Sequence, residues 1–171
     1  MAIYTIGHST RTLEELVEIL KVYSIERLVD VRTMPRSRHT PQFNAENLAN
    51  SLKRNGINYF HLDTLGGLRK TSKDSINKGW RNTSFRGYAD YMQTEDFKRG
   101  LSELMELAVV PTAIMCAEAV PWRCHRSLIG DALLVRGIEV IDIFSETKSV
   151  PEKLTSFAQT EGLTITYPLV D

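Results

Sequence analysis

Residues 113–137, AIMCAEAVPWRCHRSLIGDALLVRG, decide the fold of this chain and hold most of its candidate chemistry. The run from Ala113 to Cys116 is short and apolar, which is typical of a buried strand. From Cys124 onward the apolar residues recur at helical spacing, and Gly137 suits the left-handed residue that ends a helix. A strand, a loop and a helix in this order predict one unit of a parallel α/β sheet.

The same alternation extends in both directions along the chain. Short apolar or β-rich runs predict strands over residues 3–6, 28–31, 57–62, 113–116, 138–144 and 163–167. Helical spacing and capping signals predict helices that begin near Thr12, Asn44, Cys124 and Ser149. A further helical stretch begins at Tyr88 and continues after Thr94, a candidate cap. Strands that alternate with helices imply right-handed crossovers and a sheet covered on both faces. We therefore predict a Rossmann-like three-layer α/β sandwich, with a mainly parallel sheet flanked by helices, in a single domain over residues 1–171.

The composition is that of an ordinary globular protein, with 42% hydrophobic and 25% charged residues. No apolar run approaches the ~18 residues that a membrane span needs, and the first residues lack the pattern of a signal peptide. We therefore expect a cytoplasmic protein without a membrane partner, in which Cys116 and Cys124 are reduced thiols. The sequence specifies neither a cofactor nor an oligomeric state.

Charge is unevenly distributed, although the net charge is zero. The segment 32–86 carries eleven Lys and Arg side chains against three acidic ones. Within it, residues 63–87 contain four glycines and little periodicity, and a long irregular stretch in a compact domain is usually a binding loop or lid. A basic surface of this kind attracts phosphates or nucleic acid, or is simply offset by nearby acidic helices.

Polar or reactive side chains follow four of the predicted strands. They are His8 with Ser9, Asp30 with Arg32, His61 with Asp63, and Cys116 with Glu118. In parallel α/β sheets the binding site lies beyond the carboxyl ends of the strands, and these ends meet at one edge. The sequence therefore predicts a site at this edge.

The catalytic candidates are Cys124, Cys116, His125 and Glu118. A thiol at a helix start has a lowered pKa, because the helix dipole and nearby cations favour the thiolate. Cys124 is the better placed of the two cysteines on this ground, whereas Cys116 ends an apolar strand and is equally explained as a small buried side chain. Either thiol is a candidate nucleophile, and His125 and Glu118 would handle protons.

The substrate-binding candidates surround that group. Arginine binds phosphate or carboxylate oxygens in two-point fashion, and helix starts bind anions through free N–H groups. The residues assigned to substrate binding are His8, Ser9, Asp30, Arg32, Arg36, Arg38, His61, Tyr88 and Arg126. We therefore expect an enzyme, a cysteine-dependent hydrolase or transferase, that acts on an anionic small molecule or nucleotide.

Two other interpretations stay open. The basic segment 32–86, with Trp80 and Tyr88 for stacking, is compatible with a non-catalytic nucleic-acid or nucleotide binder. Cys116, Cys124 and His125, completed by a histidine from a neighbouring strand end, are compatible with a metal site. The spacing C-x7-C-H lacks the close C-x2-C pair that is typical of zinc sites.

Several motifs of this sequence are characteristic of one family. They are residues 4–10, 28–32, 35–38, 41–44, 65–67, 87–92 and 115–118, followed by Pro121 and residues 124–126. In order and content they resemble domain of unknown function family 488, over nearly the whole chain. The resemblance implies a small intracellular α/β protein of bacteria and archaea without an established activity. It implies no reaction, but its motifs fall on the strand-end residues chosen above.

A weaker likeness is to rhodanese and cysteine-phosphatase domains, where a strand ending in Asp-x-Arg precedes a strand ending in a catalytic cysteine. Here Asp30 to Arg32 and then Cys116 follow that order. The first arginine after Cys116 is Arg123, so the phosphatase spacing C-x5-R fails, and the loop between them contains no glycine. A loop without glycine is poorly suited to wrap backbone N–H groups around a phosphate, so this likeness is only an analogy.

Overall fold

Six strands form the central sheet of the computed structural model, which describes residues 1–169. The strands are β1 (Ala2–Gly7), β2 (Arg27–Asp30), β3 (Asn58–His61), β4 (Thr112–Cys116), β5 (Glu139–Ile143) and β6 (Ser149–Pro151). Their order across the sheet is β3-β2-β4-β1-β5-β6, and every pair is parallel except β5 with β6. The predicted mainly parallel sheet is confirmed.

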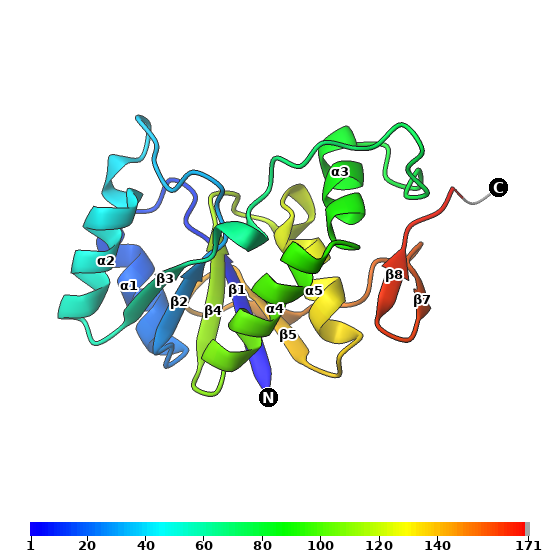
Figure 1. The fold of residues 1–171 in the computed structure, drawn as a ribbon. Coiled ribbons are helices and arrows are strands. Elements are labelled where there is room, and N and C mark those ends of the chain that lie inside the picture. The colour runs from blue at the N-terminus through cyan, green and yellow to red at the C-terminus, as the bar shows by residue number, and fades with distance from the viewer. Residues whose placement is uncertain (170–171) are drawn as a thin grey trace.

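Helices cover both faces of this sheet (Figure 1). They are α1 (Leu13–Val22), α2 (Ala45–Arg54), α3 (Thr83–Tyr91), α4 (Glu95–Leu107) and α5 (Arg126–Leu134), with 3-10 turns η1 (Pro41–Phe43), η2 (Asp63–Leu65) and η3 (Pro121–Arg123). α1 and α2 share one hydrophobic core with the sheet, and α3, α4 and α5 share the other. Alternate residues of a strand enter opposite cores, as Ile114 and Met115 of β4 do. The three-layer sandwich is thereby confirmed.

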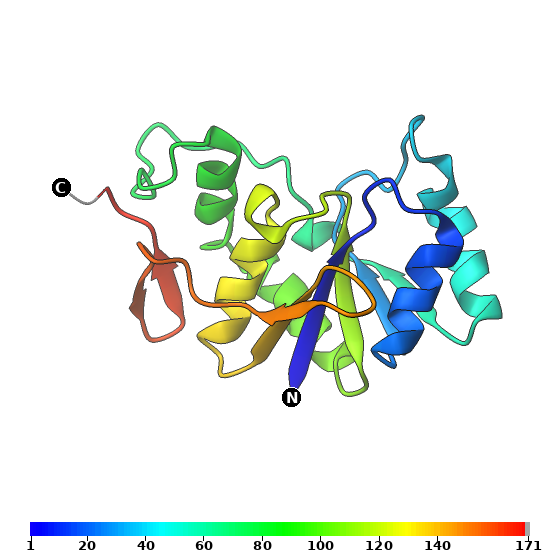
Figure 2. The same cartoon turned by 180° about the vertical axis from the view of Figure 1, so that it is seen from behind.

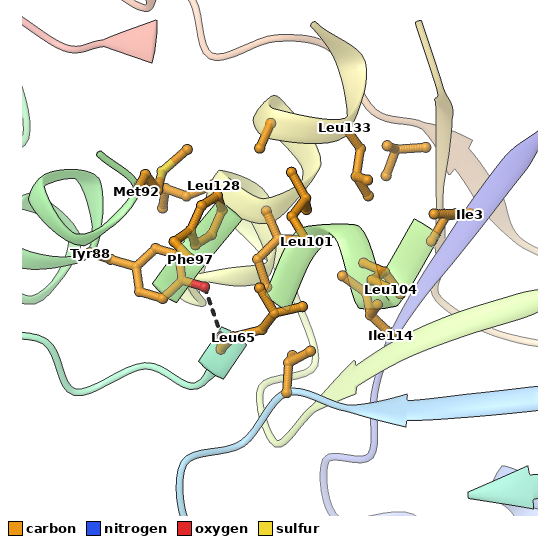
Figure 3. Close-up of a cluster of buried hydrophobic side chains, with 14 of the residues drawn as sticks. Ile3, Leu65, Tyr88, Met92, Phe97, Leu101, Leu104, Ile114, Leu128 and Leu133 are labelled. Atoms are coloured by element: carbon orange, nitrogen blue, oxygen red, sulfur yellow. Dashed lines mark hydrogen bonds between the residues drawn. The ribbon is translucent and has the colours of Figure 1, made fainter. Parts of the chain in front are cut away.

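The larger core lies between the sheet and the helices α3, α4 and α5 (Figure 3). Leu101 and Leu104 of α4 and Leu128 of α5 are at most 1% exposed there. Tyr88 of α3 is equally buried, and its hydroxyl donates a hydrogen bond to the carbonyl oxygen of Leu65 at 2.8 Å. A buried phenol needs such a partner, and this one fixes α3 against η2 at the edge where the strands end.

Local signals in the sequence act as expected at several helix ends. Thr12 and Glu15 form the predicted capping box of α1, and Thr94 caps α4. Gly56 has a φ of 76°, the left-handed value expected after α2. Asn44 precedes α2 as expected, but its side-chain oxygen accepts from the N–H of Ser37 and so orders the loop after β2.

Two predicted elements differ from the structure. The helix expected after Ser149 is wrong, since residues 149–151 form β6, antiparallel to β5 at the sheet edge. Pro151 is tolerated in an edge strand because no further strand needs its missing N–H. The helix expected near Tyr88 begins already at Thr83, capped by Asn82, so the long irregular segment is shorter than predicted. We call its remaining part, residues 66–82, the 66–82 loop.

Asp90 of α3 anchors the 66–82 loop. Its carboxylate accepts hydrogen bonds from the hydroxyls of Thr71 and Ser75, the N–H of Ser72 and the side-chain amide of Asn77. These contacts outweigh burial and lower the pKa of Asp90. A second small sheet, β7 (Gln159–Glu161) with β8 (Thr164–Thr166), lies beyond α5 and includes the last predicted strand.

Within residues 1–169, no helix combines the length and the apolar character that crossing a bilayer requires.

Candidate functional site

The loops that follow β2 and β4 and the 66–82 loop gather at the carboxyl edge of the sheet (Figures 1 and 2). Between them lies an open cavity of about 250 Å³. Its lining comprises Arg32, Thr33, Gly67, Leu68, Ser84, Phe85, Tyr88, Cys116, Ala117, Glu118, Arg123, Cys124 and His125. The cavity thus lies where the parallel topology predicts a site, and both cysteines reach it.

The two cysteines meet at the wall of this cavity. Cys116 is the last residue of β4, and Cys124 follows η3, two residues before α5 begins. Their Sγ atoms lie 2.7 Å apart, and Cys124 donates its thiol hydrogen toward Cys116. The guanidinium Nε of Arg126 donates to the Cys116 Sγ at 3.0 Å. Both thiols are free, and they form one chemical unit.

This unit ionises at Cys116. Burial disfavours the thiolate, but the hydrogen bond from Cys124 and the charge of Arg126 outweigh it and lower the pKa of Cys116 from 9.0 to about 7. Burial and the adjacent Cys116 raise the pKa of the Cys124 thiol. Of the two thiols, Cys116 is therefore the one that ionises first, and a substantial fraction of it is thiolate near neutral pH.

The guanidinium group of Arg126 binds only protein atoms within the described residues. Its side chain is fully buried, and its three donor nitrogens bind the Cys116 sulfur, the Thr5 hydroxyl at 2.8 Å and the Glu118 carbonyl oxygen at 2.8 Å. The Thr5 hydroxyl in turn donates to the buried carboxylate of Asp142. Arg126 does not line the cavity, so its role lies with the thiolate, although the sequence assigned it to the substrate.

His125 is held in one tautomer. Its Nε2 lies 2.8 Å from the carbonyl oxygen of Val31, and because a carbonyl only accepts, Nε2 carries the hydrogen. The other ring nitrogen, Nδ1, lies 3.5 Å from the Cys124 Sγ. Burial lowers the pKa of His125 to about 4, so the ring is neutral at physiological pH. Its ring also packs on that of Tyr88, with centroids 4.9 Å apart.

A second cluster positions Arg32 at the cavity. Asp30 is fully buried and accepts bonds from Arg32 Nε and Nη2, at 2.9 and 2.7 Å, and from the Tyr59 hydroxyl at 2.6 Å. Arg32 Nη2 also binds the Phe43 carbonyl, while Nη1 has only a 3.4 Å contact to Nε2 of His8. Asp30 therefore orients Arg32 and does not reach the cavity, and Nη1 is the nitrogen that Arg32 retains for a ligand.

His8 is adjacent to this cluster. Its ring stacks on Phe43 with centroids 4.4 Å apart, and Nδ1 donates to the Ser9 carbonyl oxygen at 2.8 Å. Burial lowers the pKa of His8, which leaves a neutral ring whose Nε2 accepts from Arg32. His8 thus supports Arg32 from behind the cavity wall.

Besides His8, Asp30 and Arg126, four more of the predicted substrate-binding residues do not line the cavity. Arg36 and Arg38 are exposed in the loop between β2 and η1, and Ser9 borders a different depression with Glu15 and Ser145. The exposed His61 uses Nε2 to bind the backbone carbonyl of Arg32. Glu118 does line the cavity; its side chain is exposed and forms no ion pair with an arginine anywhere in residues 1–169.

Sequence reasoning missed three residues that support the site: Thr5, Tyr59 and Asp142. Thr5 and Asp142 are polar residues inside otherwise apolar strands and are at most 5% exposed. A polar side chain at a buried strand position needs a partner, and this signal could have marked Thr5, which binds Arg126, and Asp142, which binds Thr5. Tyr59 carried no such signal. Across the described residues 1–169, no group of three His, Cys, Asp or Glu side chains is arranged to hold a metal ion.

Fold and site together define an open α/β-sheet protein with a cysteine pair at the carboxyl edge of its sheet. The model of one family, described as domain of unknown function DUF488, matches residues 12–133, and the chain belongs to that family. The match spans every assigned site residue except His8 and Ser9. No curated protein and no solved structure matches the chain in the other two comparisons.

Proposed function

We propose that this protein is a cysteine-dependent enzyme that acts on a small anionic substrate, with Cys116 as the nucleophile. The observation that carries the proposal is the contact of the Cys116 sulfur with Arg126 and Cys124 at the wall of the cavity. A thiolate is the reactive form of cysteine, and a fixed cation with a hydrogen-bond donor stabilises it before any substrate binds.

Two other arginines supply the anion site. Arg32 and Arg123 both line the cavity. The Nη1 of Arg32 has only the 3.4 Å contact to His8, and the Arg123 side chain is exposed. Guanidinium groups favour phosphate or carboxylate oxygens, so a phosphate-bearing substrate fits this pair. The rings of Phe85 and Tyr88 form an apolar wall that suits a flat group such as a nucleobase. The volume of about 250 Å³ favours a small substrate.

The remaining catalytic candidates take supporting roles in this proposal. When the Cys116 sulfur bonds to the electrophilic centre, the bond to the leaving group breaks and the leaving group departs with the electron pair and takes up a proton. In the second step a water oxygen bonds to the same centre, the bond to the Cys116 sulfur breaks, and Cys116 leaves as the thiolate. Glu118, whose exposed side chain lines the cavity, accepts the proton from that water. His125 is neutral, and its Nδ1, which carries no hydrogen, lies 3.5 Å from the Cys124 sulfur, where it can accept a proton.

A pair of alkylating probes tests both halves of the proposal. Iodoacetate is anionic and iodoacetamide is neutral, so the ratio of their rates at Cys116, normalised to free cysteine, reports anion binding. We expect the ratio to favour iodoacetate, to fall in Arg123→Gln, and to fall when inorganic phosphate is added. Peptide mass spectrometry separates Cys116 from Cys124.

Turnover is then tested with a panel of phosphorylated small molecules and nucleotides. We expect Cys116→Ser to show no turnover and Glu118→Gln to turn the substrate over more slowly than the wild type. A Cys116 that reacts no faster than free cysteine at neutral pH, in a folded protein, contradicts the nucleophile assignment. An iodoacetate preference that neither phosphate nor Arg123→Gln changes contradicts the anion site.

A further inference from the structure

We infer that Cys116 and Cys124 also form a two-electron redox pair, in which a hydroperoxide oxidises Cys116 and Cys124 closes a reversible disulfide that switches the site off. The inference rests on the proposed function in one respect, the nucleophilic Cys116. It requires no anionic substrate, and it assigns Cys124 a chemistry of its own.

The geometry brings the reacting atoms together in advance. The two Sγ atoms are in direct contact at 2.7 Å, with no side chain between them. Both cysteines line the cavity, so a small oxidant reaches Cys116 from solvent. The intervening residues 117–123 include η3 and are anchored by the Glu118 carbonyl on Arg126, and the backbone already holds both thiols at one place. A second thiol in contact is what separates a reversible redox cysteine from one that oxidises further.

The steps balance as follows. The Cys116 thiolate attacks the terminal oxygen of the hydroperoxide, so that an S–O bond forms, the O–O bond breaks, and the alkoxide or hydroxide leaves and is protonated. Cys116 has then lost two electrons and is a sulfenic acid. Cys124 attacks that sulfur, an S–S bond forms, the S–O bond breaks, and water leaves with the proton of the Cys124 thiol. An external dithiol returns two electrons and two protons and restores both cysteines.

Arg126 makes this disulfide easy to reduce. In the thiol form its buried guanidinium faces the negative charge on Cys116. In the disulfide that charge is gone, and only the neutral Thr5 hydroxyl and Glu118 carbonyl remain as partners. Asp142 remains beyond the Thr5 hydroxyl, but the loss of the anion in direct contact is unfavourable for a buried cation, so Arg126 stabilises the reduced state relative to the oxidised one. Disulfides whose reduced form is stabilised are labile and suit a switch.

The test uses the whole chain with hydrogen peroxide at equimolar amounts, followed by intact and peptide mass spectrometry. We expect the wild type to lose two hydrogen atoms and to link the peptides that contain Cys116 and Cys124. We also expect it to lose most of its Cys116 alkylation, because a disulfide offers no thiolate. Dithiothreitol restores alkylation. In Cys124→Ser, the sulfenic acid of Cys116 is trapped by dimedone. When both proteins receive a second equivalent of peroxide without dimedone, the sulfenic acid of the variant proceeds to the sulfinic acid.

Two results overturn the inference. The first is a wild type that accumulates Cys116 sulfinic acid as fast as Cys124→Ser does, and the second is a folded wild type in which peroxide modifies neither thiol. The outcomes separate the two proposals. A reversible disulfide without an iodoacetate preference leaves the redox pair and removes the anion-directed enzyme, whereas an iodoacetate preference without a disulfide does the reverse.

Discussion

The hydrogen bond from Cys124 and the charge of Arg126 together favour ionisation at Cys116. From the sequence, Cys124 was the better candidate, because a residue just before a helix gains from the helix dipole. The side chain of Arg126 instead points back from α5 to the end of β4 and donates to the Cys116 sulfur. Sequence spacing places Arg126 on the helix but does not give its rotamer, so its contact with Cys116 could not be predicted. The structure brings the four catalytic candidates Cys116, Glu118, Cys124 and His125 to one cavity, and their roles stay predictions.

The first prediction concerns this cation. Wild-type Cys116 should be alkylated by iodoacetamide with an apparent pKa of about 7, while Cys124 reacts only at much higher pH. Arg126→Lys keeps a charge but loses the fixed donor, so the pKa of Cys116 should rise toward 9.0. The measurement is the pH profile of alkylation, read by peptide mass. Arg123→Gln is the matched control, because Arg123 lines the cavity without binding the sulfur. Equal shifts in both variants would contradict the assignment to Arg126.

A second prediction at this scale concerns Tyr59, whose hydroxyl donates to the fully buried carboxylate of Asp30. Tyr59→Phe should lower the free energy of unfolding by about 1.5–3 kcal/mol, the usual range for a hydrogen bond to a charged group. Tyr23→Phe removes a bond to a neutral backbone carbonyl of Ser145 and should cost about 0.5–1.5 kcal/mol. Urea unfolding measures the loss of stability in the two variants. An equal loss would contradict the prediction that the hydrogen bond to the charged Asp30 contributes more than a bond to a neutral carbonyl.

At the scale of elements, the end of β1 packs against the 117–123 loop, which joins Cys116 to Cys124. A Cβ placed on Gly7 would overlap the backbone carbonyl of Glu118, the group that accepts from Arg126. Glycine is therefore required at the point where β1 passes beneath the 117–123 loop. The sequence shows this glycine directly before His8, but only the packing of the two segments shows its reason.

Gly7→Ala should consequently displace the Glu118 carbonyl and disturb Arg126 with it. We expect a loss of stability of about 1–3 kcal/mol, typical of overpacking, together with slower Cys116 alkylation at pH 7. Gly137→Ala is the control, since a Cβ there meets no atom within 4 Å and the cost of about 1–2 kcal/mol comes from its positive φ alone. That variant should keep the wild-type alkylation rate. A Gly7→Ala protein that is destabilised but alkylated at the wild-type rate would contradict the prediction that the position of the 117–123 loop affects the reactivity of Cys116.

The helices and strands that could be predicted are those set by a local sequence pattern, such as a capping residue or a short apolar run. Capping at Thr12 and Thr94 and the apolar run of β4 were enough to place α1, α4 and β4. β6 was mistaken for a helix because Ser149 to Glu152 carries a helix-start pattern, and pairing with β5, a nonlocal interaction, decides its structure. The start of α3 was missed because Asn82 was not taken as its cap, although its side chain accepts from the N–H of Ser84.

At the scale of the whole molecule, Glu152 links stability to pH. Both its carboxyl oxygens are buried. Burial, followed by the charges of Asp142 and Asp131, raises its pKa from 4.5 to about 9. The folded protein therefore holds a proton that the unfolded chain releases, and stability falls as pH rises between those two values. The slope is at most about 1.4 kcal/mol per pH unit.

Glu152→Gln should accordingly raise stability at pH 8 and make the decline from pH 5 to pH 9 shallower, because the neutral amide has no proton to lose. Glu161→Gln, on the exposed β7, should leave the curve unchanged. The free energy of unfolding from urea titrations at several pH values provides the comparison. A Glu152→Gln curve as steep as that of the wild type would show that the carboxyl group is ionised in the folded state.

The strand order of the whole sheet was beyond the reach of sequence reasoning, since alternation predicts parallel strands but not their neighbours. That order, β3-β2-β4-β1-β5-β6, has a consequence during synthesis on the ribosome. β1 is translated first, yet both of its partners lie in residues 112–143. Ile3 and Ile6 emerge from the exit tunnel with no strand to pair with, while β2, β3 and their helices are still being made. β1, the central strand, therefore stays without its sheet partners until translation passes residue 143.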